Sequence, residues 1–256
     1  MTPSQTIRYL QYLNDRTDTI EGETIVEAPV SLTVNGENWL TFMCTTLQLE
    51  ELAIGFLYNE GVISNRNELA DVHVCEHGDN IDVWLNHSVE KPPKWRRTSG
   101  CSGGVTAVDL LSEGLPAIPS NGAILTPLQI YELIVRLFES QDLYKETGGV
   151  HTTILSDGDN TIIKAEDIGR HNTLDKIAGA MLQLEPVLPH KILITTGRIS
   201  SEMLQKAARL QVEILISRTS PSSLSIQLAE RMGVTLIGYA RRNRFNVYAH
   251  PERIIS

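Results

Sequence analysis

Residues 191–240 read KILITTGRISSEMLQKAARLQVEILISRTSPSSLSIQLAERMGVTLIGYA, and this stretch decides the fold. Short apolar runs alternate in it with longer segments whose apolar residues recur at helical spacing. We expect strands at Ile192–Thr195, Glu213–Ser217 and Thr235–Tyr239, and helices at Ser201–Leu210 and Ser222–Met232. Alternation of this kind predicts a largely parallel sheet covered by helices on both faces.

The residues that precede this stretch extend the same α/β pattern. Thr126-Pro127-Leu128-Gln129 has the composition of a capped helix start and leads into an apolar helical face. Two strands, Val150–Leu155 and Thr161–Ala165, and a helix, Thr173–Leu184, follow. We therefore assign residues 123–256 to one α/β part.

The first half has a pattern of hairpins. Asn35-Gly36 accepts positive φ and separates the apolar runs Val30–Val34 and Trp39–Cys44. A helix is expected over Leu47–Tyr58, and a second hairpin is expected to pair Val72–Cys75 with Ile81–Leu85. Residues 1–20 are polar and predict a poorly ordered lead-in, and residues 86–122 are irregular. We assign residues 22–122 to a smaller β-rich part.

Composition excludes several classes of protein. With 256 residues, of which 41% are hydrophobic, the chain can bury a sizeable core. A net charge of −9 disfavours nucleic acid as a partner, because phosphates repel it. No apolar run approaches the length of a bilayer span and Met1 begins no secretory leader, so we expect a cytoplasmic protein that does not enter a membrane.

Three cysteines are too few and too widely spaced for a disulfide framework or a zinc ribbon, so we expect no intrinsic metal. Cys44 and Cys75 stand in apolar, strand-like surroundings and are expected in the core. Cys101 follows Arg96-Arg97 and is surrounded by glycines and hydroxyl residues. Nearby cations favour the nucleophilic thiolate, and small residues keep the backbone approachable. We expect Cys101 to be the chemical centre, the alternative being an incidental cysteine in a surface loop.

Three strand-to-helix junctions carry polar residues and an arginine each: residues 166–172, 195–201 and 217–223. Ligands of open α/β sheets bind outside the carboxyl ends of strands, where helix N-termini offer free N–H groups to anions. Together with the basic stretch near residue 240, the junctions predict a site for a pyrophosphate-bearing ligand, against the alternative of ordinary helix caps. The candidate residues are Gly197, Arg198, Ser217, Arg218, Tyr239, Ala240, Arg241, Arg242, Asn243 and Arg244.

Two histidines accompany these junctions. His151 begins a strand beside Gly148-Gly149, and its ordinary interpretation is a hydrogen-bonded histidine. His171 lies near Asp167 and Arg170, where a helix start could orient the imidazole, and we include it among the ligand-binding candidates. Glu202 and Lys206 are four residues apart on a helix, a spacing typical of a surface ion pair.

Five segments in order resemble the formate dehydrogenase accessory sulfurtransferase family of the FdhD type. They are LEELAIGFL at 49–57, GGVH at 148–151, EDIGRHN at 166–172, SSEM at 200–203 and Ser217-Arg218. The resemblance covers about residues 25–250. It implies a second half similar in fold to cytidine deaminases, a three-layer structure with a mixed sheet.

The resemblance also implies a function. A member of this family accepts sulfur from a cysteine desulfurase as a cysteine persulfide and delivers it to the molybdenum cofactor in its bis-molybdopterin guanine dinucleotide form, for formate dehydrogenase. Cys101 stands at the position of the persulfide cysteine, and Tyr239–Arg244 stand where the family binds the cofactor. A homodimer is expected, with apolar hairpins of the first half as a candidate contact.

One departure from the family pattern leaves alternatives open. Many members have two cysteines separated by two residues, whereas Gly104 occupies the second position here, so a single-cysteine carrier is the simplest mechanism. The alternative is a non-enzymatic chaperone that binds the cofactor and has lost sulfur transfer. A zinc-dependent deaminase is disfavoured, because His151 is followed by Thr152-Thr153 and the paired-cysteine motif is absent from the sequence.

Overall fold

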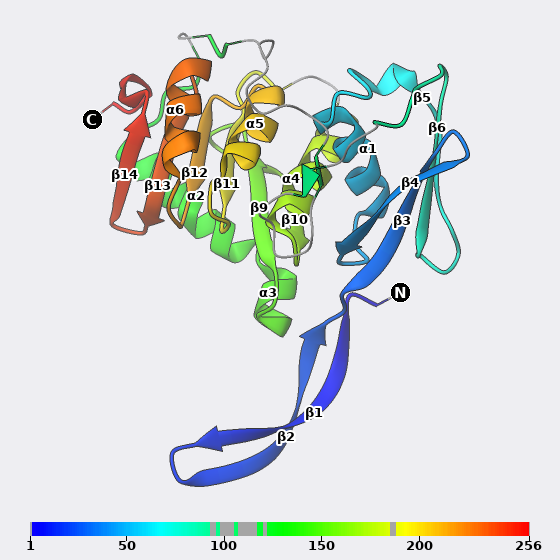
Figure 1. Cartoon of the computed structure of the whole chain (residues 1–256). Helices are drawn as coiled ribbons and strands as arrows, with labels where there is room; N and C mark the ends of the chain where they lie inside the picture. The colour runs from blue at the N-terminus through cyan, green and yellow to red at the C-terminus, as the bar shows by residue number, and fades with distance from the viewer. Residues whose placement is uncertain are drawn as a thin grey trace.

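The computed structural model describes residues 2–92, 96–97, 105–106, 117–119, 122–184 and 188–255. Its largest sheet has six strands in the order β10-β9-β11-β12-β13-β14 (Figure 1). These strands are β9 (His151–Ser156), β10 (Thr161–Asp167), β11 (Ile192–Thr195), β12 (Ile214–Ser217), β13 (Thr235–Arg241) and β14 (Arg244–Ala249). The predicted alternation of strands and helices over residues 191–240 is confirmed.

The expectation of a largely parallel sheet is wrong, whereas a mixed sheet is confirmed. Only the β11–β12 and β12–β13 pairings are parallel, and the other three pairings are antiparallel. The reason is local: β9 and β10 form a hairpin, and β14, which the sequence pattern did not reveal, returns from β13 through a turn at Arg242-Asn243. A turn this short can join only antiparallel neighbours.

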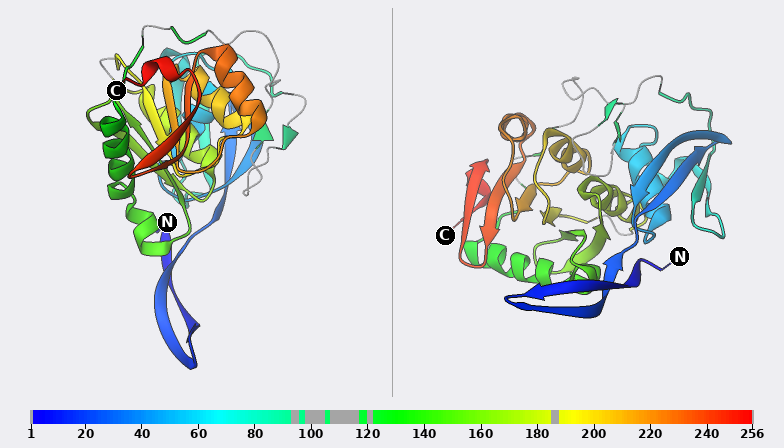
Figure 2. Two further views of the ribbon diagram at one scale, coloured as in Figure 1. Left: turned by 90° about the vertical axis from the view of Figure 1, so that its left-hand side faces the viewer. Right: turned by 60° about the horizontal axis from the view of Figure 1, so that its bottom comes forward.

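The central strands β11 and β12 are buried on both faces, and each face of the sheet has its own core. Leu155, Leu193 and Leu215 pack with helices α4 (Arg170–Met181), α5 (Ser201–Arg209) and α6 (Ser223–Met232). Ile154, Ile194 and Ile216 pack on the opposite face with α2 (Pro127–Glu139). The result is three layers, with α2 on one side of the sheet and α4, α5 and α6 on the other (Figure 2). The closer likeness to cytidine deaminases stays a prediction.

Two helix starts show how local chemistry sets the boundaries. Thr126 caps α2 as expected, since its hydroxyl accepts from Gln129 N and the Gln129 side chain accepts from Thr126 N. Helix α4 begins at Arg170, three residues before the predicted start. Asp167 Oδ1 accepts from Gly169 N and from Asn172 Nδ2, which orders the chain early enough to place Arg170 and His171 on the first turn.

A second sheet, in the order β4-β3-β6-β5, forms the first half with helix α1 (Leu49–Asn59). Its strands are β3 (Ala28–Val34), β4 (Glu37–Cys44), β5 (Leu69–Val74) and β6 (Asn80–Leu85), and the short helix η1 (Arg66–Glu68) precedes β5. The turn at Asn35-Gly36 has the predicted positive φ at both residues. Helix α1 packs on this sheet with one face and crosses α4 with another. The division of the chain after residue 122 stays a prediction.

The first twenty residues are not a poorly ordered lead-in. Strands β1 (Ser4–Leu13) and β2 (Arg16–Ile25) form a long antiparallel hairpin, which we call the arm, and it projects from the body (Figure 1). The arm touches the body at its base, where Ser4 Oγ donates to Glu146 Oε1 and Ile25 lies beside Gly149. Its threonines favour strands, but its many charged residues lower the mean hydropathy, and for that reason the sequence pattern was taken as a polar lead-in.

Outside the sheets, short elements complete the described chain. Strand β7 (Arg96–Arg97) pairs with β8 (Val105–Thr106), helix α3 (Asp142–Thr147) follows α2, and η2 (Pro251–Arg253) lies near the C-terminus. Cys44 is buried as expected, but Cys75 is only half-buried, because β5 ends at Val74 and leaves it in a turn. Among the described residues, no helix combines the length and apolarity needed to cross a bilayer.

Candidate functional site

The three polar junctions meet at one edge of the large sheet, as predicted. Ser217 Oγ donates to the Gly197 carbonyl at 2.7 Å, and Arg218 N donates to Thr195 O at 3.1 Å. The junction before α4 approaches closely as well, since a Cβ on Gly197 would lie 2.9 Å from Arg170 Cβ. A larger residue at position 197 would therefore separate two of the junctions.

A pocket of about 390 Å³ opens at this edge. Its lining includes His151, Thr196, Arg218, Gln141 and Tyr144. Thr196 Oγ1 accepts from Thr152 N at 3.1 Å and lies 3.3 Å from His151 Nδ1, so His151 has a partner within the loop. Burial first, and then the Arg170 and Arg198 cations, lower the pKa of His151 and keep the imidazole neutral.

A larger cleft of about 820 Å³ adjoins this pocket. Gln141 and Tyr144 line both spaces, and the wall of the larger one is completed by Phe138, Lys145, Arg241, Arg242, Asn243 and Arg244. The Arg218 guanidinium lies 4.3 Å from the centre of the Phe138 ring, where the two spaces meet. Burial, followed by the Arg241 cation, lowers the pKa of Arg218, and a bound anion would offset both effects.

Helix α3 supplies Tyr144 to both spaces, with Gln141 just before its first turn, and sequence reasoning missed this helix. The Glu166 carboxylate holds its first turn, accepting from Leu143 N at 2.8 Å and from Tyr144 N at 3.0 Å. Glu166 was recognised only as part of a motif. The sequence did carry a signal for α3. Glu166 is an acidic residue at the end of a buried strand, and a buried carboxylate needs hydrogen-bond donors from a neighbouring element.

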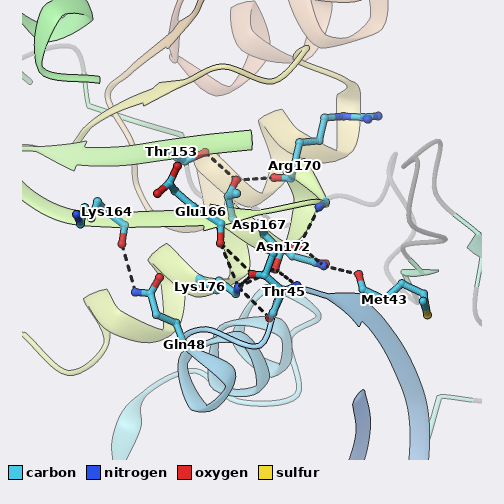
Figure 3. Close-up of polar contacts among 12 residues, drawn as sticks. Met43, Thr45, Gln48, Thr153, Lys164, Glu166, Asp167, Arg170, Asn172 and Lys176 are labelled. Carbon is cyan, nitrogen blue, oxygen red and sulfur yellow. Dashed lines mark hydrogen bonds and ion pairs between the residues drawn. The ribbon is translucent and has the colours of Figure 1, made fainter. Parts of the chain in front are cut away.

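Asp167, the last residue of β10, makes its contacts on the other side of the strand from Glu166 (Figure 3). Its Oδ2 accepts from Lys176 Nζ at 2.6 Å and from Thr45 N at 3.0 Å, and both charged side chains are fully buried. Thr45 belongs to the first half of the chain, so this network fixes that half against the start of α4. The adjacent carboxylates of Glu166 and Asp167 thus anchor α3 and α4 on the two sides of the site.

Comparison with known proteins agrees with these motifs. A model of the FdhD/NarQ family matches residues 25–255. The chain belongs to the FdhD/NarQ family.

Relatives of this family share most of their length with the chain. Sulfur carrier protein FdhD from Staphylococcus aureus strain bovine RF122 / ET3-1 is 36% identical over 235 residues, which are 90% of this chain and 89% of the relative. The same protein from strain Newman gives the same identity and coverage. A crystal structure described as a putative formate dehydrogenase accessory protein from Desulfotalea psychrophila superposes with a TM-score of 0.81 and 28% identity, covering 99% of this chain and 100% of that one.

His171, the remaining histidine candidate, lies at the first turn of α4 beside Glu202. Its side chain is almost fully buried, Nε2 lies 3.6 Å from Glu202 Oε2, and neither ring nitrogen has a hydrogen-bond partner among the residues that the structure describes. Burial first, and then the Lys206 and Arg170 cations, hold the pKa of His171 well below its usual range. The imidazole is therefore neutral and lines neither of the two spaces described above.

The expectation of a surface ion pair between Glu202 and Lys206 is wrong. Lys206 is buried and pairs instead with Asp175, its Nζ lying 2.6 Å from Oδ2. Asn59 Nδ2 donates to the same carboxylate at 2.7 Å. The spacing of four was misleading because α5 presents Lys206 to α4 and not to solvent.

The remaining FdhD/NarQ candidates divide by burial. Ser217 and Ala240 are buried, and the Ser217 hydroxyl is used inside the loop, where it accepts from Thr219 N. Arg198 and Tyr239 are exposed. Cys101 and Gly104 lie outside the described residues. Within the described part of the chain, no group of three or more His, Cys, Asp or Glu side chains is arranged to hold a metal ion.

Proposed function

We propose that this chain is a sulfur carrier that receives persulfide sulfur from a cysteine desulfurase on Cys101 and delivers it to the molybdenum cofactor used by formate dehydrogenase. The names of the relatives support the sulfur-carrying role. The cofactor part of the proposal is supported by the cleft that Arg241, Arg242 and Arg244 line. This cleft shares Gln141 and Tyr144 with the pocket that holds Arg218. The cofactor is substrate here, and we place the exchange in the cytoplasm, where thiols are kept reduced.

Of the two described cysteines, Cys44 is a poor nucleophile, which supports Cys101 as the carrier. Burial, followed by the Asp167 charge, raises the pKa of the Cys44 thiol to about 12. The Cys75 thiol donates to Asp79 Oδ1 at 2.9 Å. In the loading step, the Cys101 thiolate attacks the terminal sulfur of the desulfurase persulfide, a new S–S bond forms, and the desulfurase thiolate leaves.

The chemistry of the cleft suits the bis-molybdopterin guanine dinucleotide form of the cofactor. Each dinucleotide arm carries a pyrophosphate, and guanidinium groups bind such oxygens with paired hydrogen bonds. Phe138 and Tyr144 offer aromatic surfaces beside those cations, suitable for a flat heterocycle. The volume of about 820 Å³ lies in the range of sites that enclose a small molecule.

Intact mass spectrometry tests the carrier role. After incubation with a cysteine desulfurase and cysteine, we expect the protein to gain one sulfur atom that reductant removes. Replacing Cys101 by alanine should abolish the gain, and Cys75→Ala should preserve it, because Cys75 donates to Asp79. Absence of sulfur on the unchanged protein, with cofactor binding intact, would instead favour the non-enzymatic chaperone, which the presence of Gly104 in place of a second cysteine supports.

Calorimetric titration with GDP, as a probe for one nucleotide arm, tests the cleft. Arg218→Gln should weaken GDP binding at least about tenfold, because a charge-assisted hydrogen bond contributes about 1.5–3 kcal/mol. Arg231→Gln is the matched control, since Arg231 is exposed at the end of α6 and should leave affinity unchanged. Equal affinities of the Arg218 variant and the unchanged protein would mean that the pocket that holds Arg218 is not part of the nucleotide site.

A further inference from the structure

A turn of the chain at residues 250–255, which we call the latch, closes on the start of α2. The latch consists of His250, the short helix η2 and the two residues that follow it, and it lies beside the end of α6 (Figure 1). Leu125 N donates to Arg253 O at 2.9 Å, and Ile255 N donates to Leu125 O at 3.0 Å. The latch therefore fixes the chain just before α2 begins.

Arg253 is a charged side chain buried inside the latch. Only 2% of its surface is exposed, and the hydrogen bonds of its guanidinium go to uncharged oxygens of the described chain. Nη1 donates to Gly233 O at 2.9 Å and to Thr235 Oγ1 at 3.0 Å, and Nη2 donates to Pro119 O at 2.8 Å. Burial of a charge without a counter-charge is costly, so other contacts must hold the latch closed.

The backbone of His250 adds a second cost. Its φ of 49° and ψ of 60° lie in the left-handed region, which is unfavourable for a residue with a Cβ. The His250 carbonyl accepts from Thr235 Oγ1 at 2.9 Å, and the same hydroxyl accepts from Arg253. One hydroxyl group thus joins the strained residue to the buried guanidinium, and a movement of either one disturbs the other.

The His250 imidazole faces a hydrogen-bond acceptor on each ring nitrogen. Nδ1 lies 2.8 Å from Glu252 Oε1, and Nε2 lies 3.0 Å from the backbone oxygen of Glu230. A neutral imidazole has one N–H group and one lone pair, whereas the imidazolium has two N–H groups. Only the imidazolium can donate to both acceptors, because a neutral ring would turn a lone pair toward one of them.

The charged groups around His250 favour the same form. Glu252 comes from η2, and Glu230 comes from α6, with its carboxylate 3.8 Å from Nε2. Arg253 of η2 is engaged by the oxygens named above, and β13 contributes the neutral Thr235 hydroxyl. Burial lowers the pKa of His250, but the hydrogen bonds to Glu230 and Glu252 and the charges of both carboxylates outweigh burial, so the pKa is raised above its ordinary value.

We propose that the latch is a pH-sensitive device, closed on the start of α2 while the His250 imidazolium bridges Glu252 and Glu230 and loosened when that proton is lost. A group whose pKa is raised in the folded state contributes its full stabilisation below its ordinary pKa, which is about 6.5 for histidine. That contribution is lost as the pH rises through the folded-state pKa. The latch therefore opens more readily as the pH rises above about 6.5.

The latch and the larger cleft lie at opposite ends of α2. The helix begins two residues after Leu125, whereas Phe138, in its last turn, lines the cleft. Loosening of the latch acts on the first turn of α2 and changes no residue of the cleft. The proposal therefore does not depend on sulfur transfer or on the cofactor.

Hydrogen exchange followed by NMR tests the latch. The reporters are the amides of Leu125 and Ile255, which bond across the contact between the latch and the start of α2. Protection factors correct for the intrinsic effect of pH on exchange. From about pH 6 to about pH 8.5 they should fall at least about threefold for these amides relative to Ile194 and Ile216 in the large sheet. In the same samples, the His250 imidazole should titrate above about pH 6.5.

Three variants separate the imidazole from the rest of the latch. His250→Asn keeps a residue that tolerates the left-handed backbone, so it should lower the protection of Leu125 and Ile255 at about pH 6 and abolish its pH dependence. Glu252→Gln alters a carboxylate that is 55% exposed, and it should move the transition to lower pH without affecting folding. His190→Asn is the matched control, because His190 is also paired with a carboxylate through Nδ1 but lies outside the latch. It should behave as the unchanged protein.

The outcomes that would overturn the proposal are equally definite. A His250 imidazole that titrates at or below about pH 6.5 would mean that the two acceptors do not hold its second proton. Latch protection that is independent of pH, or a His250→Asn variant that keeps the pH dependence, would mean that the imidazole does not control closure. An equal loss of protection in His190→Asn would assign the effect to the protein as a whole.

Discussion

Replacing Lys176 by methionine is expected to lower the free energy of unfolding by about 3–5 kcal/mol, because it leaves a buried carboxylate without its counter-charge. Lys176 Nζ lies 2.6 Å from Asp167 Oδ2, donates to Thr45 Oγ1 at 2.8 Å and has no exposed surface. Water cannot replace the lost ammonium without entering the core. Urea unfolding followed by tryptophan fluorescence and circular dichroism measures the loss.

An exposed ion pair provides the matched control. Lys164 pairs with Asp142, but the two side chains are 50% and 68% exposed, so Lys164→Met should change stability by about 1 kcal/mol or less. The double variant Lys176→Met/Asp167→Asn should be less destabilised than the sum of its single variants, because it removes both buried charges. Equal losses at Lys176 and Lys164, or strict additivity, would contradict this account of the network.

The regular parts of the second half were predictable because local and tertiary preferences agree there. Thr126 and Ser222 cap the helices α2 and α6 that the apolar spacing predicts. Short apolar runs such as Ile192–Thr195 can be buried on both faces only between two helical layers. The convergence of the junctions followed from the shared direction of β11 and β12, which pair in parallel.

What the sequence could not reveal depends on contacts distant along the chain. Lys176 and Lys206 have the pattern of exposed helical lysines, and their burial follows only from Asp167 and Asp175 in the folded structure. Helix α3 has six residues, too few for a periodic pattern, and is held by Glu166. The arm buries neither of its faces within its own chain. Its strands therefore do not need the alternation of apolar and polar residues by which a half-buried strand is recognised.

The site itself was partly predictable. Arg218 and the Arg241–Arg244 turn were expected at one sheet edge, and the structure places them around two adjoining spaces. Gln141 and Tyr144 were missed together with α3. His171, which was named among the ligand-binding candidates, lies beside Glu202 and lines neither of these two spaces, and its role in binding stays a prediction.

A single methyl group added where α1 and α4 cross is expected to cause a large loss of stability. The two helices meet at Gly55 and Gly179, where a Cβ on Gly55 would lie 1.7 Å from the Asp175 carbonyl oxygen and a Cβ on Gly179 would lie 2.0 Å from that of Glu51. The obstructing atoms belong to helix backbones, so relief requires separation of the two helices and loss of the packing between them. This contact joins the two halves of the chain.

Gly55→Ala and Gly179→Ala are each expected to cost about 3 kcal/mol or more, because overpacking here must outweigh the roughly 1 kcal/mol by which alanine favours a helix. Gly148→Ala is the contrasting control: Gly148 has a φ of 69°, but no atom lies within 4 Å of the place that an added methyl group would take, so only the left-handed strain of about 1–2 kcal/mol is expected. Urea unfolding midpoints of the three variants decide the matter. A Gly55 or Gly179 variant as stable as the unchanged protein would mean that α1 and α4 do not cross at these glycines, and the position of the first half against α4 would have to be redrawn.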